Sequence, residues 1–109
     1  MILDEINALL DTLSVPYETG VFSDEAPEQY IVIVPLTDTF ALHADNLPNA
    51  DIEEVRLVVY SQTNYTSLVN NLVAALLLND FTVTDRHYIG YDSMAGYHQY
   101  VVDAEKVYV

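Results

Sequence analysis

The chain has 109 residues, 51% of them hydrophobic, which predicts one folded domain spanning residues 1–109 and excludes an intrinsically disordered chain. Seventeen acidic residues against three basic ones give a formal net charge of −14, which disfavours ordinary DNA or RNA binding because such a surface repels phosphate. The absence of cysteine excludes disulfides and thiolate chemistry, and no apolar run approaches the ~18 residues of a membrane span.

The first part of the chain predicts a helix followed by two strands. Ile2–Leu13 carries its apolar residues on one helical stripe, and Pro16 disfavours helical backbone just before it. Tyr17–Phe22 predicts a short strand. Tyr30–Thr37 is apolar on both faces, which predicts a strand in the middle of the sheet. Pro35 has no backbone N–H and therefore predicts a bulge or the end of regular pairing in that strand.

The second part predicts a strand, a helix and a hairpin. Glu54–Tyr60 is rich in β-branched residues, and Tyr65–Leu78 is the strongest helical pattern, with apolar residues recurring on one face up to Leu77. Asn64 is a suitable N-cap for this helix, and Asn79 a suitable left-handed residue after it. The remaining elements are strands at Phe81–Tyr88 and Tyr97–Ala104, joined by a loop at Gly90–Gly96. The predicted order is α-β-β-β-α-β-β.

Residues that bear catalytic or metal-binding chemistry form no complete pattern. His87 and His98 fall on neighbouring strands with Asp85 and Asp92 nearby, but a third protein ligand at a recognisable spacing is missing, so we favour surface histidines over a metal site. The Asp45–Asp51 loop suits turns better than a calcium site. No glycine pattern of a nucleophile elbow or of a phosphate-binding loop is present. We therefore predict that the protein is not an enzyme and that it uses no cofactor or metal.

Tyrosines concentrate in the last third of the chain. Five of the nine are found there: Tyr88, Tyr91, Tyr97, Tyr100 and Tyr108. A tyrosine ring can pack while its hydroxyl stays hydrated, which suits a protein interface. Ordinary strand composition explains the same enrichment. Both interpretations stay open at this point.

Four segments together resemble one family of viral structural proteins. They are Glu25–Leu36 (EAPEQYIVIVPL), Asp51–Tyr60 (DIEEVRLVVY), Asp85–Asp92 (DRHYIGYD) and Gly96–Asp103 (GYHQYVVD). The chain is similar, over most of its length from Glu25 onward, to the tail terminator or tail completion proteins of long-tailed phages and prophages. The resemblance implies an α+β fold, with a mostly antiparallel β-sheet and two helices packed on one of its faces.

The resemblance also implies a structural role in the virion. Members of this family assemble into rings, commonly hexamers, that cap the tail tube and face the head connector, with phage DNA passing through the centre. The implied partners are further copies of the chain, the tail tube and the head-connector proteins, with no specific nucleic-acid binding and no membrane. The implied location is the virion tail, with the host cytoplasm during assembly.

A ring that DNA traverses benefits from a lumen that does not bind phosphate. The candidate lumen acids are Asp24, Glu25, Glu28, Asp45, Asp51 and Glu53. For subunit or partner contacts we expect the three scarce bases, each meeting a neighbouring carboxylate, together with four tyrosines: Arg56, Arg86, Lys106, Tyr88, Tyr91, Tyr97 and Tyr100. The alternative function is an acidic inhibitor that mimics DNA, which acts as a monomer.

Overall fold

The structure, a computed structural model, describes residues 2–19, 27–40 and 51–108, with only the backbone of residues 37–40 and 51. It contains two helices and five strands: α1 (Ile2–Leu13), β1 (Tyr17–Thr19), β2 (Gln29–Phe40), β3 (Asp51–Ser61), α2 (Thr66–Leu78), β4 (Thr82–Asp92) and β5 (Tyr97–Tyr108). The class is α+β, and the order matches the predicted α-β-β-β-α-β-β.

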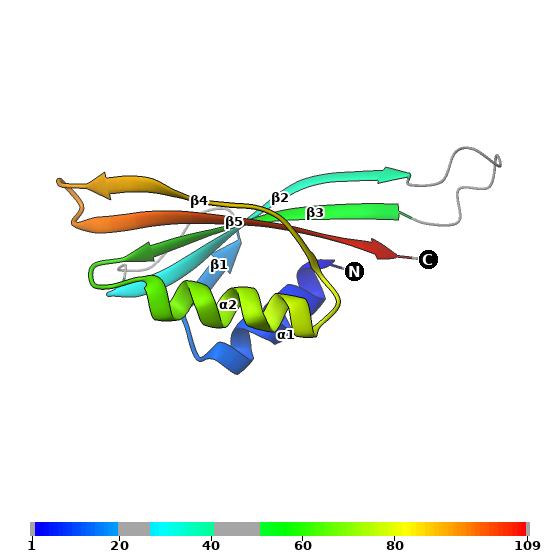
Figure 1. Cartoon of the computed structure of the whole chain (residues 1–109), viewed down its shortest axis with the longest axis horizontal. Helices are drawn as coiled ribbons and strands as arrows, with labels where there is room; N and C mark the ends of the chain where they lie inside the picture. Colours follow the sequence, from blue (N-terminus) through cyan, green and yellow to red (C-terminus); the bar gives the residue numbers. More distant parts are fainter. Residues whose placement is uncertain (1, 20–26, 41–50, 109) are drawn as a thin grey trace.

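All five strands belong to one sheet, in the order β1-β2-β3-β5-β4. β1 runs parallel to β2, and every other neighbouring pair is antiparallel. Both helices lie on the same face of this sheet, so the described chain has two layers (Figure 1). The implied arrangement, a mostly antiparallel sheet with its helices on one face, is therefore confirmed.

The central strand of the sheet is β3, whereas Tyr30–Thr37, predicted in the middle, lies in β2, which is an interior strand next to the edge strand β1. β3 pairs along its whole length with β2 on one side and β5 on the other. β2 has only the three-residue β1 beyond it. The strand is nevertheless buried on both faces at Ile31–Ile33, as its composition suggested. The register of β2 shifts between Pro35 and Thr37, which confirms the irregularity predicted at the proline.

The core lies between the helices and the sheet. α1 contributes its predicted stripe, α2 contributes three side chains, and the facing strands contribute alternate residues. These buried groups are Ile2, Ile6, Leu9 and Leu10 from α1, Val69, Leu72 and Leu76 from α2, and Ile31, Ile33, Val55, Leu57, Val59, Val102 and Ala104 from the sheet. Burial of this continuous apolar surface is the main stabilising term for the fold.

The start of α2 differs from the capping prediction by one residue: Tyr65, not Asn64, is the N-cap residue, and its side chain makes no capping hydrogen bond. The Asn64 side-chain oxygen accepts a hydrogen bond from the backbone N–H of Thr66 at 2.8 Å. This bond satisfies one of the donors that the first helical turn leaves unpaired. The helix begins at Thr66, one residue later than predicted.

The end of α2 differs from the prediction by one residue. Asp80, with φ of 66°, is the left-handed residue, whereas Asn79 has φ of −103°. The N–H of Phe81 donates to the carbonyl of Leu76 at 3.0 Å, and the N–H of Asp80 donates to Leu77 at 3.3 Å. These two bonds form a Schellman motif, which turns the chain from α2 directly into β4.

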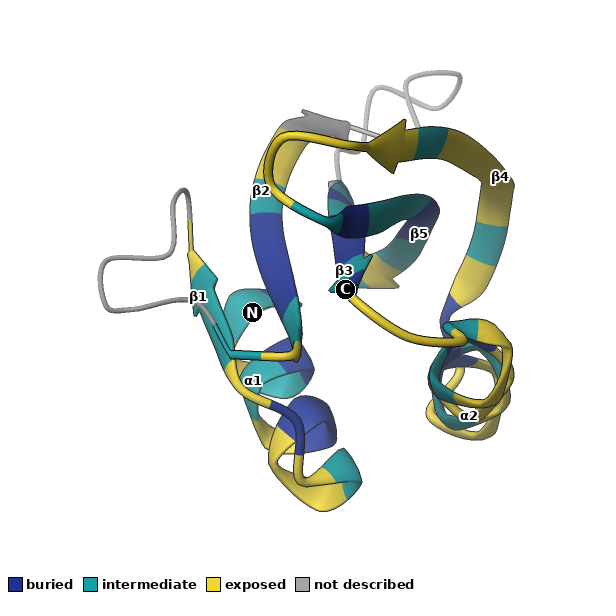
Figure 2. Cartoon of the chain, turned by 90° about the vertical axis from the view of Figure 1, so that its left-hand side faces the viewer, coloured by how far each residue is buried: buried dark blue, intermediate teal, exposed yellow. Residues whose placement is uncertain are grey.

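The molecule is elongated, with dimensions of 51 × 25 × 24 Å, and the β4–β5 hairpin extends past the helices at one end of it (Figure 1). Residues 86–98 of this hairpin are called the hairpin arm below. Its turn is shorter than the predicted Gly90–Gly96 loop, because β4 continues to Asp92. The Asp92 carboxylate accepts from the N–H groups of Met94 and Ala95, and Gly96 has φ of 81°. Almost all of β4 is exposed (Figure 2).

Two substitutions in α2 test whether its inner face holds the fold together. Leu72 is fully buried, so Leu72→Ala is expected to lower the free energy of unfolding by about 2–5 kcal/mol, through lost transfer energy and a residual cavity. Ser67→Ala, on the exposed side of the same helix, is expected to change it by no more than about 0.5 kcal/mol. Urea unfolding curves compare the two, and equal small effects would mean that α2 does not cover the sheet.

Candidate interaction surfaces

Arg56 is committed to an ion pair within its own chain. It lies opposite Asp103 across β3 and β5, and its Nε and Nη2 donate to the two carboxylate oxygens at 2.9 and 3.0 Å. Asp103 is buried, and these hydrogen bonds raise the pKa of the Arg56 guanidinium. Arg56 is therefore already paired within its own chain, although its side chain stays 42% exposed. Its charge is already used to satisfy a buried carboxylate, whose isolation would be costly.

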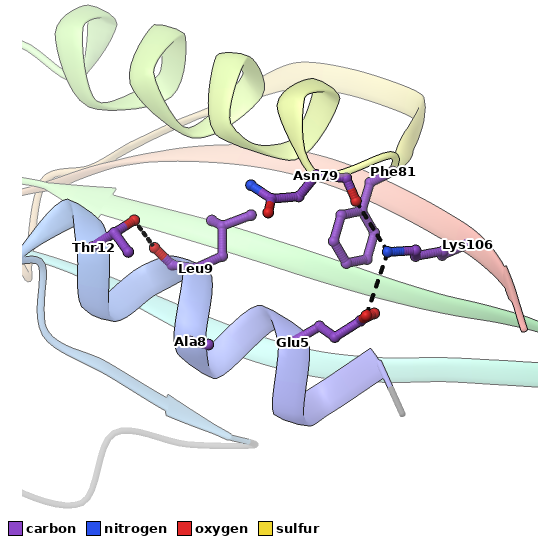
Figure 3. A pocket seen from close by; sticks show the side chains of 7 residues that line it. All are labelled: Glu5, Ala8, Leu9, Thr12, Asn79, Phe81 and Lys106. Atoms are coloured by element: carbon purple, nitrogen blue, oxygen red, sulfur yellow. Dashed lines mark hydrogen bonds and ion pairs between the residues drawn. The ribbon is translucent and has the colours of Figure 1, made fainter.

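Lys106 is also satisfied internally, on the helix side of β5. Its Nζ lies 3.4 Å from Glu5 Oε1, donates to the carbonyl of Asn79 at 3.0 Å, and sits 4.8 Å from the centre of the Phe81 ring (Figure 3). The Asn79 carbonyl lies at the C-terminal end of α2, where the helix dipole favours a positive charge. The predicted role of Lys106 between subunits is corrected accordingly, because this cation ties α1 to the end of α2.

A cleft of about 250 Å³ lies beside this ion pair, between α1, the end of α2 and β5 (Figure 3). The Tyr108 hydroxyl donates to Glu5 Oε2, and this bond lowers the pKa of Glu5, with Lys106 contributing less. Burial, and then the same carboxylate, raise the pKa of Tyr108. The charged groups at the cleft therefore already satisfy one another, which favours a structural role for them over ligand binding.

Arg86 differs from the other two bases. Its Nε donates to the Tyr100 hydroxyl at 3.3 Å, and its side chain is exposed. Within the described part of the chain, it has no ion pair with a carboxylate. Of the three cations proposed for intermolecular contacts, Arg86 is thus the one that remains available for them.

A cluster of aromatic rings joins the hairpin arm to the start of α2. The Tyr65 ring stacks on Tyr88 with centroids 5.4 Å apart, and it also packs 5.4 Å from Tyr100 and 5.8 Å from His98. Tyr91 lies 4.7 Å from His98, whose Nδ1 shares a 2.9 Å hydrogen bond with the Tyr88 hydroxyl. Three of the four candidate interface tyrosines therefore stiffen the arm, although Tyr88 and Tyr91 keep large exposed areas.

Tyr97 lies apart from this cluster, on the face of the sheet that the helices do not cover. Its ring packs edge-on against the stacked rings of Tyr30 and Tyr60. Its hydroxyl donates to the carbonyl of Pro27 at 2.7 Å. Because Tyr97 is buried, its prediction as an interface residue is not supported, and its role is to pack against β2 and β3.

The two histidines that raised the question of a metal site face opposite sides of the hairpin. His87 pairs with Val101 on the helix-free face, and its Nδ1 lies 3.0 Å from Asp85. His98 faces the helices, within the aromatic cluster. The two rings cannot share an ion in this arrangement. No group of three or more metal-binding side chains occurs within residues 2–19, 27–40 and 51–108.

The candidate lumen acids do not form one group. Glu28 is exposed, as a lumen residue would be. Glu53 is only 4% exposed, and its Oε2 has no hydrogen-bond partner in the described part of the chain, so its assignment to a lumen is corrected. Asp24, Glu25 and Asp45 lie outside the described residues, and only the backbone of Asp51 is described.

Large exposed apolar side chains are the feature that the sequence analysis missed. Leu77 and Leu78, at the end of α2, are 58% and 83% exposed, and Met94, in the turn of the hairpin arm, is 98% exposed. The placement of Leu77 on the buried face was wrong. Three consecutive leucines at 76–78 span about 200° of a helix, which is more than one buried stripe accommodates. The run of three leucines could therefore have indicated, from the sequence alone, that at least one of them is exposed.

No protein-family model matches this sequence, and no curated protein matches it either. Neither of the two described helices combines the length and the hydrophobicity that crossing a membrane requires. The functional argument therefore depends on the charges, contacts and exposed surfaces above and on the family resemblance of the four segments.

A pH series tests the contact between Glu5 and its two partners. Since the folded-state pKa of Glu5 is lowered, its contribution is present above the ordinary value of 4.5 and is lost as the pH falls through the folded value. Glu5→Gln is expected to cost up to about 1 kcal/mol at pH 7, because the group is partly exposed and screened. This deficit should shrink progressively as the pH falls below 4.5.

The matched control is Glu18→Gln, which removes one carboxylate whose side chain makes no hydrogen bond to the described residues. Urea unfolding at pH 7, 5, 4 and 3 compares both variants with the wild type. A Glu5→Gln deficit that stays constant across this range, or one that Glu18→Gln reproduces, would contradict the assigned contact.

Proposed function

We propose that this protein is a structural component of a phage tail, forming a homo-oligomeric ring that caps or completes the tail tube and joins it to the head connector. The observation that carries the proposal is the exposed apolar surface of an otherwise highly acidic chain. Leu78 and Met94 are almost fully exposed in a protein with a net charge of −14. Exposed apolar surface of this kind is typical of a protein that functions in contact with others.

The resemblance to tail terminator and tail completion proteins supports this role. The four similar segments include most of the residues of β2, β3, β4 and β5, so the likeness extends over the sheet that organises the fold. In such a ring the protein would act in the virion tail, after assembly in the host cytoplasm. Its proposed partners are other copies of itself, the tail tube and the head connector.

The charge distribution is compatible with DNA passing through such a ring. Arg56 and Lys106 are neutralised by carboxylates of their own chain, so the surface offers few cations to DNA phosphate. Each contact between a cation and a phosphate would have to break again as DNA moves. Exposed acids such as Glu28 would keep the lumen from holding the DNA.

Assembly as a function of salt tests the proposal. Six copies carry 6 × −14 = −84 charges, which oppose association at low ionic strength. Because salt screens that repulsion over about 10 Å at 0.1 M, we expect a monomer or weak oligomers at low salt and rings as salt and protein concentration rise. Isolated tail tubes should stabilise the ring by mass action. Light scattering followed by native mass spectrometry measures the stoichiometry.

A strict monomer under every condition, also with tail tubes present, would contradict the ring. The same preparation distinguishes the alternative, a monomeric acidic protein that mimics DNA. Strong, salt-sensitive inhibition of a DNA-binding nuclease by the monomer would support the mimic instead. Under the tail proposal, no such inhibition is expected.

A further inference from the structure

The most unusual surface in this acidic protein is one without charge. From Ser61 to Asn79 the sequence contains no Asp, Glu, Lys, Arg or His, although this stretch includes the whole of α2. Surface helices normally carry charged residues on their solvent side. The exposed side chains of α2, called the α2 outer face below, include Ser67, Asn70, Asn71, Ala74, Leu77 and Leu78.

The hairpin arm presents the second set of exposed apolar side chains. Ile89 and Tyr91 are about half exposed, and Met94 projects from the turn. The aromatic cluster around Tyr65 holds the arm firmly, so these side chains lie on a stiff support. The six residue steps from Arg86 to Asp92 span about 20 Å. The thirteen residues of α2 span about the same length, so the arm can lie along the helix.

The two surfaces also complement each other in charge. The arm carries Arg86, the base without a carboxylate partner in the described part of the chain. It also carries one carboxylate, Asp92, which accepts hydrogen bonds from the N–H groups of Met94 and Ala95 in the turn. Asp80 follows the exposed leucines at the C-terminal end of α2, where the helix dipole is negative. Arg86 on the arm would therefore be attracted to Asp80 and to the C-terminal end of α2, next to the α2 outer face.

A single chain cannot bring these surfaces together. In Figure 1 the arm points away from the N-terminal end of α2, whereas Leu77 and Leu78 lie at the opposite end of that helix. The contact therefore needs a second molecule. Another copy of this chain fits, because it supplies both surfaces and because the α2 outer face brings no carboxylate to the contact when two chains of −14 approach.

We infer that the α2 outer face of one copy binds the hairpin arm of the next copy. The inference rests on the proposed ring and names its subunit contact. Two different surfaces meet in this contact, so it is heterologous and repeats from copy to copy, closing into a ring when the rotation allows. Burying Leu78, Met94 and Tyr91 away from water would drive the association, and Arg86 would orient it.

Two single substitutions and their mixture test this contact. Leu78→Lys damages the α2 outer face and Met94→Lys damages the arm, while each moves the formal charge from −14 to −13 and so reduces overall repulsion. The control is Val107→Lys, which makes the same change at an exposed site on the helix-free face of β5. All three sites are exposed, so melting curves should match the wild type.

At a salt concentration where the wild type forms rings, each of the first two variants alone should associate at least tenfold more weakly. Val107→Lys should form rings as the wild type does. A mixture of Leu78→Lys and Met94→Lys should form a 1:1 dimer and nothing larger, because the intact arm of the first binds the intact α2 outer face of the second. Native mass spectrometry resolves these species.

Other outcomes overturn the inference in distinguishable ways. If Leu78→Lys and Met94→Lys both form rings as the wild type does, the proposed contact is excluded, whereas the proposed ring is not. Association lost only in Leu78→Lys would indicate symmetric contact between two α2 helices, again without the arm. A wild type that never associates, even with tail tubes, would remove both the contact and the proposed function.

Discussion

The scarcity of positive charge constrains every contact that this protein makes. Seventeen acids face three bases, and the fold uses two of those bases internally. Arg56 satisfies the buried carboxylate of Asp103, and Lys106 joins Glu5 to the end of α2. In the proposed ring, contacts between copies would then come mainly from uncharged atoms. Such contacts would account for a helix free of charge and for the exposed leucine and methionine side chains in an acidic chain.

The sheet places those uncharged atoms where another molecule can reach them. β3 pairs with β2 and β5 along its whole length, and the helices cover only part of the resulting layer. The β4–β5 hairpin continues beyond that cover, and the rings of Tyr65, Tyr88 and Tyr100 fix it to the start of α2. The same tyrosines that suggested an interface therefore hold the arm in place. In the proposed ring they would support the contact indirectly, and neighbouring side chains such as Met94 would make it.

Local patterns predicted most of the fold, because helices and strands each impose their own spacing on apolar residues. The stripe in Ile2–Leu13, the hydrogen bond from Thr66 to Asn64 before α2 and the irregularity at Pro35 all follow from interactions within a few residues. The central position of β3 did not, since it depends on which strands pair across the whole chain. Composition made Tyr30–Thr37 equally suitable for that place.

The surfaces were harder to predict than the fold, for the same reason. The sequence shows Arg56 and Lys106, but it does not show which distant carboxylates pack against them in the fold. In the same way, it does not show that Glu53 is buried on the helix side of β3. Leu77 belonged to a regular pattern of apolar residues, and only the packing of α2 shows that this pattern is wider than the face it buries. Charge counts predict the overall repulsion, whereas three-dimensional contacts decide which charges stay free.

The most direct test of this account is an electron cryomicroscopy map of the assembled protein, detailed enough to trace α2 and the β4–β5 hairpin in each subunit. The account predicts a closed ring in which the hairpin of one subunit lies along α2 of the next, with Leu78 and Met94 buried at the contact. A ring in which α2 faces solvent, or in which carboxylate-rich surfaces of neighbouring subunits meet, would contradict it.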